Sequence, residues 1–401
     1  MSVVVDFRDV NILFGKTSAR ALKMLDEGHT RSEVAAETGN VLGVAGANLS
    51  VDRGEICVLM GLSGSGKSTL LRAANGLNKV ARGKVLVGEG ADVIDVASCD
   101  ERALRKVRLE RVSMVFQQFG LLPWRTVREN VGLGLELRGG DPAARKRIVD
   151  EQLALVGLDQ WADRYASELS GGMQQRVGLA RALAMNPDIL LMDEPFSALD
   201  PLIRTKLQDE LLALQAAVRK TILFVSHDLD EALKIGNHIS ILEGGRIVQT
   251  GTPEDIVLRP ANDYVGEFVR HMNPLTVLRG ATVMRPAPSL SSDGRRMWLD
   301  DDRRYALNLD SGGRPVDAHV GGIAHSVTAF DDIARAMSFP GGLVMVPCQT
   351  SLRNVLELRQ SSGHPVLLSE DGVFRGVCGD ADILKALSGV DRPRARVPAE
   401  A

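Results

Sequence analysis

The sequence lacks any long apolar segment. Among its 401 residues, no uncharged apolar run approaches the roughly 18 to 20 residues that a helix needs to cross a bilayer. The first ten residues, MSVVVDFRDV, contain charges where a secretory signal would need an apolar run. These absences predict a cytoplasmic chain, for which any role at a membrane would depend on a partner.

Cysteine, aromatic residues and net charge are also scarce. The four cysteines, at positions 57, 99, 348 and 378, lie far apart without metal-ligand spacing, which favours reduced buried thiols over disulfides or zinc. A formal net charge of −3 provides no strong field to attract nucleic acid or anionic lipid. Hydrophobic residues at 44 % and charged residues at 25 % are typical of a globular protein, and the length allows two domains.

Residues 1 to about 272 alternate between strand-like and helical patterns. Three short apolar runs lead directly into polar motifs, at 54–60, 187–195 and 221–228. Runs that are apolar on both faces suit a parallel sheet covered by helices, which carries function at the carboxyl ends of its strands. Between them, Leu207, Leu211 and Leu214 recur at helical spacing. The predicted fold class is therefore α/β.

Two regions depart from a minimal α/β domain. Residues 19–40 predict a helical hairpin, because Gly28 can end one helix and Thr30 with Glu33 forms a capping box for the next. After residue 272 the composition loosens into RPAPSLSSDGRR. We therefore expect a second small α/β domain at 273–390, with helix, strand, Asp-Gly turn, strand and helix over 350–389. Residues 391–401 are expected to form a flexible tail.

The stretch GLSGSGKST, residues 61–69, fits the pattern G-x-x-x-x-G-K-[ST] between an apolar strand and a helix. Glycines allow backbone amides to close around phosphate oxygens, and the following helix points its positive end at them. Lys67 is expected to reach the β- and γ-phosphates, and Ser68 to supply a hydroxyl to Mg²⁺. The expected phosphate-binding residues are Gly61, Leu62, Ser63, Gly64, Ser65, Gly66, Lys67, Ser68 and Thr69. The chain is thus predicted to bind a nucleoside triphosphate.

Three later motifs supply candidate catalytic and metal-binding groups. The run ILLMDEP ends in Asp193, a candidate magnesium ligand, and Glu194, which can polarise a water molecule. Two adjacent acids could instead begin a solvated turn. Gln117 follows another apolar strand and can ligate the metal, while His227 follows a third; an isolated histidine is more often structural. The expected catalytic residues are Glu194, His227 and Gln117, and the expected magnesium ligands are Ser68, Gln117 and Asp193.

A second glycine-containing stretch, LSGGMQQ at 169–175, opens another predicted helix. Ser170 is a candidate N-cap, and Gly171 and Gly172 leave the amides of the first turn accessible. The stretch contains no lysine, so it cannot form a complete phosphate site by itself. A plain capped helix is the alternative interpretation.

Together these motifs, in their order and spacing, resemble the ATPase subunits of ABC transporters over residues 5–272. The resemblance implies a P-loop ABC ATPase domain with a helical signature subdomain at 118–186. It makes Gln117 the Q-loop glutamine, Glu194 the catalytic glutamate and His227 the switch histidine. It implies ATP and Mg²⁺ as cofactors and a head-to-tail dimer, in which each ATP lies between Lys67 of one copy and Ser170 of the other. It adds Ser170, Gly171, Gly172, Gln174 and, in the D-loop SALD, Asp200 to the ATP-binding residues.

The family also stacks adenine on an aromatic residue roughly 25 positions before the phosphate loop. That window has no aromatic residue here. Phe14, which precedes the predicted hairpin, matches the usual local context and is assigned to adenine stacking; the alternative is a core phenylalanine. Trp124, in the apolar segment FGLLPWRTVREN, is a candidate contact with a membrane subunit, with a buried core tryptophan as the alternative.

The hairpin and motif sequences resemble the importer branch for glycine betaine, proline betaine and choline, with QQFGLLPWRTVRENV most similar to choline-uptake ATPases. This resemblance implies an integral membrane permease, a periplasmic or lipid-anchored substrate-binding protein, no nucleic-acid partner, and a peripheral position on the cytoplasmic face of the inner membrane. A quaternary ammonium needs an aromatic cage, and at 4 % aromatic residues this chain shows none, so the cage is expected in the binding protein.

Residues 273–390 resemble a degenerate CBS pair. Asp382 is present, but Gly379 stands where a hydroxyl residue usually helps bind nucleotide, so nucleotide sensing, sensing of ionic strength or of a membrane surface, and structural packing all stay open. The functional alternatives are an importer of another amine or an amino acid, a regulator that only binds ATP, and a soluble ABC ATPase acting on nucleic acid or ribosomes. The last typically has two fused cassettes or a coiled-coil insertion, which are not seen here.

Overall fold

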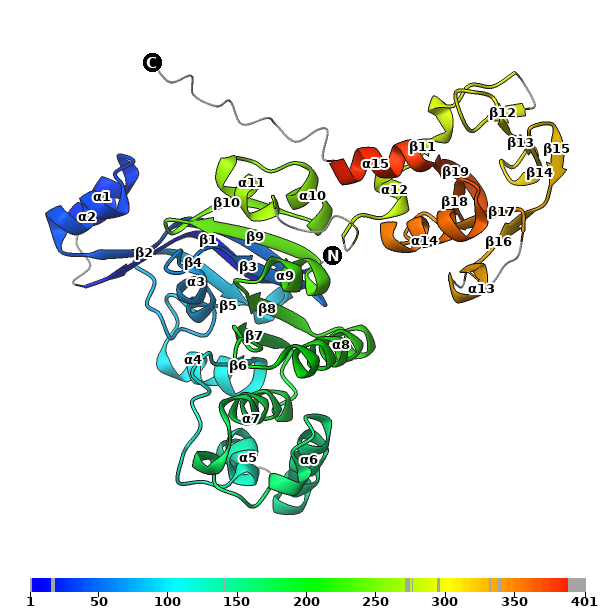
Figure 1. Cartoon of the computed structure of the whole chain (residues 1–401). Coiled ribbons are helices and arrows are strands. Elements are labelled where there is room, and N and C mark those ends of the chain that lie inside the picture. The colour runs from blue at the N-terminus through cyan, green and yellow to red at the C-terminus, as the bar shows by residue number, and fades with distance from the viewer. Residues whose placement is uncertain are drawn as a thin grey trace. The chain divides into compact units, whose positions relative to one another are not determined.

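The computed structural model of the protein describes residues 2–15, 19–139, 141–270, 275, 277–293, 296–331, 333–337 and 341–388. The chain divides into two compact units, Met1–Ile256 and Val257–Ala401 (Figure 1). The domain boundary predicted at 272/273 and the tail predicted from 391 lie outside the described residues, so both stay predictions. Within the described part, no helix combines the length and the apolarity needed to span a membrane.

The first unit contains the predicted parallel sheet. Its strand order is β10-β9-β3-β8-β7-β6, and all neighbouring pairs are parallel except β10 with β9. Every residue of the central strands β3, β7 and β8 is buried, which explains their uninterrupted apolar sequences. The six strands are β3 (Ile56–Met60), β6 (Val112–Val115), β7 (Ile189–Asp193), β8 (Thr221–Val225), β9 (His238–Glu243) and β10 (Arg246–Gly251).

A second, antiparallel sheet packs against the first and was not anticipated from the sequence. Its order is β2-β1-β4-β5, and its side chains share one hydrophobic core with β3, β7 and β8. The strands are β1 (Val3–Phe14), β2 (Val41–Asp52), β4 (Arg82–Val87) and β5 (Ile94–Asp95). Because β1 and β2 are antiparallel neighbours, the segment that links them begins and ends at the same end of the two strands.

That link contains two helices, α1 (Ala19–Asp26) and α2 (Arg31–Thr38), in the region where the hairpin was predicted. The Thr30 side chain accepts from the Glu33 amide while the Glu33 carboxylate accepts from the Thr30 amide at 2.7 Å. This reciprocal pair caps α2. Apolar side chains of both helices form a small core with the adjoining strand ends, comprising Leu13, Ala21, Met24, Leu25, Val34, Leu42 and Ala45.

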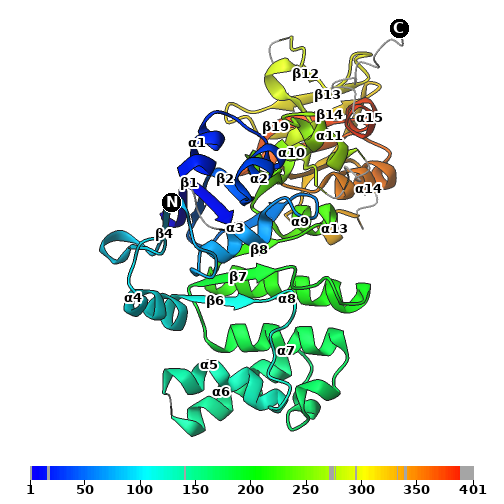
Figure 2. The ribbon, with the colours of Figure 1, turned by 90° about the vertical axis from the view of Figure 1, so that its left-hand side faces the viewer.

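Helices surround the parallel sheet, and three of them form a separate helical part below it (Figure 2). These three are α5 (Val127–Arg138), α6 (Pro142–Leu155) and α7 (Gly171–Ala184). The other helices of the chain's first 270 residues are α3 (Lys67–Ala73), α4 (Glu101–Lys106), α8 (Pro201–Val218), α9 (Leu229–Ile235), α10 (Pro253–Leu258) and α11 (Asp263–Val269).

The second unit is also α/β. A five-stranded sheet has the order β11-β19-β18-β17-β16, and a four-stranded antiparallel sheet has the order β12-β13-β14-β15. Its strands are β11 (Arg285–Pro286), β12 (Arg296–Trp298), β13 (Tyr305–Leu309), β14 (Pro315–Val320), β15 (Ile323–His325), β16 (Val327–Ala329), β17 (Leu343–Pro347), β18 (Val366–Glu370) and β19 (Val373–Cys378). Its helices are α12 (Gly280–Val283), α13 (Ile333–Met337), α14 (Leu352–Ser362) and α15 (Asp380–Ser388). The order α14, β18, β19, α15 is the one expected for residues 350–389.

The four cysteines are free thiols. Cys57 and Cys378 are buried, whereas Cys99 and Cys348 are partly exposed. Burial raises the pKa of the Cys378 thiol to about 12. The prediction of unpaired thiols is confirmed. The prediction that they are buried holds for Cys57 and Cys378 only.

Candidate functional site

The loop between β3 and α3 holds residues 61–69, and two of its glycines are required by close backbone contacts. Gly61 has φ +144°, and a Cβ atom there would lie 2.2 Å from the Leu242 carbonyl oxygen. Gly66 has φ +103°, and its Cβ atom would lie 2.5 Å from the Gly43 carbonyl oxygen. Any side chain at these two positions would therefore displace the loop.

Lys67 is buried and folds back over this loop. Its Nζ atom donates to the carbonyl oxygens of Gly61 at 2.8 Å and Leu62 at 3.0 Å. Burial lowers the pKa of Lys67, and the carboxylates of Glu194 and Asp193 act in the opposite direction. An ammonium group has three donors, and these two bonds use two of them.

Ser65 in the same loop is buried, and among the described residues its hydroxyl oxygen has no hydrogen-bond partner. A buried polar atom without a partner is costly. This hydroxyl and the third proton of the Lys67 ammonium are therefore donors that an anionic ligand could use. The loop therefore fits the phosphate groups that the sequence predicted. Leu62, Ser63 and Gly64 are exposed at its rim.

Asp193, at the end of β7, is fully buried and faces α3. Ser68 Oγ donates to Asp193 Oδ1 at 2.6 Å, so these two predicted magnesium ligands lie side by side. Arg72 binds Asp193 Oδ2 through Nε at 3.1 Å and Nη2 at 2.8 Å. Arg72 was missed in the sequence, although it lies one helical turn after Ser68 on α3 and could have been found by that spacing.

The donor set around Asp193 fits a magnesium ion that is completed by other ligands. A serine hydroxyl and a carboxylate are hard oxygen donors of the kind that Mg²⁺ prefers, and Gln117, which contacts the adjacent Glu194, can add an amide oxygen. Among the described residues, no group of three or more His, Cys, Asp or Glu side chains could hold a metal ion alone. The remaining ligands would have to be phosphate oxygens and water, as is usual for Mg²⁺ with nucleotides.

The three predicted catalytic residues meet at one carboxylate. Gln117 Nε2 donates to Glu194 Oε2 at 3.1 Å, and His227 Nδ1 lies 3.3 Å from the same oxygen. Glu194 has a left-handed backbone with φ +49°, which is uncommon for a residue with a side chain and marks local strain. The His227 side chain is 61 % exposed, so it is open to a ligand at this edge of the sheet.

The two glutamines of LSGGMQQ have different contacts. Gln174 Nε2 donates to the carbonyls of Ala166 and Leu169, at 3.0 and 3.3 Å. Gln175 is buried, donates to the Glu194 carbonyl at 3.2 Å and accepts from the Ala198 amide at 3.2 Å. Gln175 therefore connects α7 to Glu194 and to the 197–200 turn. The adjacent pair gives no sequence signal for which glutamine has this role.

Ser170 is the N-cap of α7, and its hydroxyl accepts from the Met173 amide at 3.5 Å. Ser170 and Gly171 are exposed at the surface of this chain. Asp200 similarly caps α8 by accepting from the Ile203 amide at 3.0 Å. Ser170 and Asp200 therefore cap the first turns of α7 and α8, and both side chains are accessible to solvent.

Phe14 lies beside the phosphate loop helix despite its distance in sequence. It pairs with Val41 across the β1–β2 ladder, so the hairpin returns the chain to the same edge. A Cβ atom at Gly43 would lie 2.8 Å from Phe14 Cε2 and 2.9 Å from Thr69 Cγ2. The Phe14 ring and Thr69 therefore flank Gly43. The ring is 44 % exposed, which argues against the core alternative.

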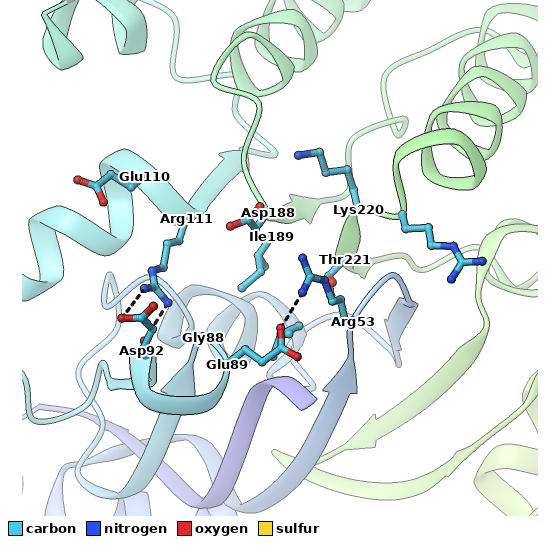
Figure 3. A pocket seen from close by; sticks show the side chains of 12 residues that line it. Arg53, Gly88, Glu89, Asp92, Glu110, Arg111, Asp188, Ile189, Lys220 and Thr221 are labelled. Atoms are coloured by element: carbon cyan, nitrogen blue, oxygen red, sulfur yellow. Dashed lines mark hydrogen bonds and ion pairs between the residues drawn. The ribbon is translucent and has the colours of Figure 1, made fainter. Parts of the chain in front are cut away.

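A cavity of about 580 Å³ lies at the opposite, amino-terminal ends of β7 and β8 and contains none of the motif residues (Figure 3). Two of its three arginines already have acidic partners. Arg53 Nη1 lies 2.8 Å from Glu89 Oε2, and Arg111 Nη2 lies 3.8 Å from Asp92 Oδ1. Its distance from the motif residues makes this cavity a poor candidate for the nucleotide.

The chain is similar to known transport proteins. The family model described as ABC transporter matches residues 44–197. The glycine betaine/carnitine transport ATP-binding protein GbuA of Listeria monocytogenes is 42 % identical, over 96 % of this chain and 98 % of that protein. The glycine betaine/proline betaine transport system ATP-binding protein ProV of Escherichia coli is 40 % identical over the same shares. A solved dimer of the bacterial ABC transporter cassette MJ0796 superposes with a TM-score of 0.54 at 31 % identity, covering 62 % of this chain and 98 % of that one.

Proposed function

This chain belongs to the family of ABC transporter ATP-binding subunits, and from that premise we propose that it hydrolyses ATP to drive uptake of glycine betaine, proline betaine or a related quaternary amine. The observation that carries this proposal is the similarity to GbuA and ProV, which extends over 96 % of this chain and thus includes the second unit. Relatives with other cargo, such as a methionine importer subunit that is 44 % identical over 59 % of this chain, match a smaller part.

The described geometry supports a specific division of labour in hydrolysis. Residues 61–69 and Lys67 would hold the phosphates, and Phe14 would stack on the adenine. Ser68, Asp193 and Gln117 would hold Mg²⁺, which when bound neutralises charge on the phosphate oxygens. Glu194 offers the carboxylate that accepts a proton from water, with His227 and Gln117 within 3.3 Å of its Oε2 atom. Both neighbours can orient that carboxylate.

We further propose that Ser170, Gly171, Gly172 and Asp200 complete the site of a second copy of the chain. Ser170 and Gly171 are exposed here, and the related cassette MJ0796 was solved as a dimer. In a head-to-tail pair each ATP would lie between Lys67 of one copy and Ser170 of the other. Gln174, by contrast, is committed to carbonyls of its own chain.

The partners of the proposed transporter are an integral membrane permease and a substrate-binding protein. Trp124 is 70 % exposed, which excludes the buried-core alternative and leaves an apolar side chain available for the permease. The chain would then work peripherally at the cytoplasmic face of the membrane. Choline is a narrower possibility for the cargo, suggested only by the sequence around Trp124, and another amine or amino acid is the alternative.

For residues 273–390 we propose a degenerate CBS pair that acts through packing. The Asp382 carboxylate, expected at a ligand site, accepts from the Gly379 amide at 2.8 Å and lies 3.1 Å from Arg285 Nε. Both contacts serve the unit's own fold. They support the structural alternative over nucleotide sensing.

The test is ATP-dependent uptake by the chain reconstituted with its permease and binding protein in vesicles. Labelled glycine betaine should accumulate only with ATP, and unlabelled proline betaine or choline should compete with it. An amino acid such as methionine serves as the control competitor. Transport of methionine in preference to quaternary amines would overturn the proposed cargo, and absence of ATP hydrolysis would overturn the proposed function itself.

A further inference from the structure

A buried acid that none of the sequence motifs includes lies beneath the switch histidine. Glu231, in the first turn of α9, is 9 % exposed. Ser226 Oγ lies 2.6 Å from Glu231 Oε2, and Gln208 Nε2 donates to Glu231 Oε1 at 3.0 Å. Ser226 directly precedes His227, so Glu231 contacts the residue next to the switch histidine.

The hydrogen bonds around Ser226 make Glu231 an acceptor. The Ser226 hydroxyl has one proton, and the Glu231 carboxyl at 2.6 Å is nearer to it than the Asp228 carbonyl at 3.1 Å. The Asp228 carbonyl already accepts from the Ala232 amide at 3.1 Å, and the Asp228 amide donates to Ser226 Oγ at 3.0 Å. When Ser226 donates to Glu231, the hydroxyl, the Asp228 carbonyl and both Glu231 oxygens all have partners.

The contacts of the Glu231 carboxyl group are hydrogen bonds from Ser226 and Gln208. Within the described residues, no lysine or arginine forms an ion pair with it. Lys234, on the same helix, is turned to Gln208 Oε1 at 3.1 Å and Asp209 Oδ1 at 2.7 Å. Burial raises the pKa of Glu231, hydrogen bonds from Ser226 and Gln208 lower it, and the charges of Asp228 and Arg204 act in opposite directions.

A second set of contacts links the 226–228 turn to α8. Arg204 Nη1 lies 3.4 Å from Asp228 Oδ2, and Arg204 Nη2 donates to the Leu199 carbonyl at 3.3 Å. Arg204 and Gln208 are one turn apart on α8, which begins directly after Asp200. Helix α8 thus contacts the 226–228 turn through Asp228 and through Glu231.

We propose that Glu231 is a positioning residue that accepts hydrogen bonds from Ser226 and Gln208 and thereby holds the 226–228 turn against α8, so that His227 stays within reach of Glu194. Because the His227 side chain is mostly exposed, its place depends on the backbone of this turn and on the contact with Glu194. Glu231 itself does not touch the reacting groups. The inference rests on the proposed ATP hydrolysis and deepens it.

The test compares steady-state ATPase kinetics of the full chain with three variants. Glu231→Ala should lower kcat by about 10- to 100-fold, the range expected for a displaced catalytic group, while KM for ATP stays within about twofold because the phosphate loop is untouched. Glu231→Gln should restore most of kcat, because its amide oxygen can still accept from Ser226. Asp230→Asn is the matched control, since this neighbouring acid is exposed and should leave kcat unchanged.

Rescue by glutamine separates positioning from a merely structural role. Glutamine keeps the size of the side chain and one acceptor oxygen, whereas alanine lacks both. The kcat of Glu231→Gln should therefore exceed that of Glu231→Ala at the same KM for ATP. Equal kcat values for the two variants would overturn the assigned hydrogen bond to Ser226.

Other outcomes also decide the inference. If Glu231→Ala keeps wild-type kcat, the positioning role is wrong. If circular dichroism shows that Glu231→Ala does not fold, Ser226→Ala, which removes the same hydrogen bond, should lower kcat with KM unchanged, and a normal kcat would contradict the proposal. Absence of hydrolysis by the wild type would instead refute the proposed function.

Discussion

Arg31 donates a hydrogen bond from Nη1 to the carbonyl oxygen of Gly64 over 2.8 Å, across 33 residues of sequence. Arg31 is the first residue of α2, and Gly64 lies in the middle of the phosphate loop. Within the described residues, no carboxylate forms an ion pair with Arg31. The helical hairpin is therefore in direct contact with the loop that is proposed to bind ATP.

Replacing Arg31 with alanine should weaken ATP binding without abolishing it. Loss of one hydrogen bond from a charged donor corresponds to a decrease in affinity of about 10- to 150-fold at most. Calorimetry with a non-hydrolysable ATP analogue measures the change. Arg20→Ala is the control, because Arg20 pairs with Glu37 on the hairpin surface. Equal affinity of the Arg31→Ala variant and the wild type would show that the contact does not order the loop.

Phe14 provides a test of adenine stacking. Phe14→Ala should raise the dissociation constant for ATP by about fivefold to tenfold, as expected for a lost aromatic stacking contact, and Phe14→Trp should retain binding. Quenching of the introduced tryptophan by ATP would report the contact directly. The assignment fails if both variants bind like the wild type and no quenching occurs.

The Glu194→Gln variant should bind ATP and form dimers without hydrolysing it. The amide keeps the size of the side chain but cannot accept a proton from water at neutral pH. Light scattering at saturating ATP should detect the dimer, with ADP as the comparison. Glu243→Gln, which changes an exposed acid at the end of β9, should behave like the wild type. A Glu194→Gln protein that stays monomeric with ATP would contradict the shared-site dimer.

Two inactive variants should complement each other if the sites are shared. Lys67→Ala should lose ATP affinity, and Ser170→Arg should keep affinity but lose turnover. In a mixed dimer of the two variants, one ATP site contains both substitutions. The other site contains the unchanged Lys67 of one copy and the unchanged Ser170 of the other, and is intact. Half of the dimers in an equal mixture are mixed, so turnover of about a quarter of the wild-type value is expected for independent sites in a symmetric dimer.

The control for that experiment is a mixture of Lys67→Ala with Glu194→Gln. Lys67 and Glu194 belong to the same site of one chain, so both sites of the mixed dimer contain a defect. No turnover should return. Recovery in this mixture, or none in the first, would mean that Ser170 does not serve the partner's nucleotide.

Trp124→Ala should uncouple transport from hydrolysis. The side chain is 70 % exposed and its loss should remove permease contact area while leaving the site around Glu194 intact. Uptake by reconstituted vesicles should fall by about tenfold or more while the ATPase activity of the isolated chain stays normal. Trp161→Ala, at a tryptophan that is 41 % exposed on the same helical part, is the control. Equal loss of both activities would indicate a structural role for Trp124.

Local sequence patterns determined much of this molecule. The capping box of Thr30 and Glu33, the glycines of the phosphate loop and the fully buried strands before Asp193 and His227 were all visible without coordinates. Each depends on hydrogen bonds or steric limits within a few residues, so the chain records them in short motifs. The parallel sheet followed, because its central strands are apolar on both faces.

Only the tertiary structure decided which distant groups meet. Pairing of β1 with β2 brings Phe14 to Gly43 and Thr69, and the packing of α3 beneath β7 gives Asp193 the Arg72 guanidinium. The antiparallel sheet, the choice of Gln175 over Gln174 and the place of Glu231 beneath Ser226 likewise depend on long-range packing. The sequence alone determined which residue types the site contains, because each motif lies within a few consecutive residues. The fold decided which other side chains contact those residues, because contacts between distant segments leave no periodicity or spacing in the sequence.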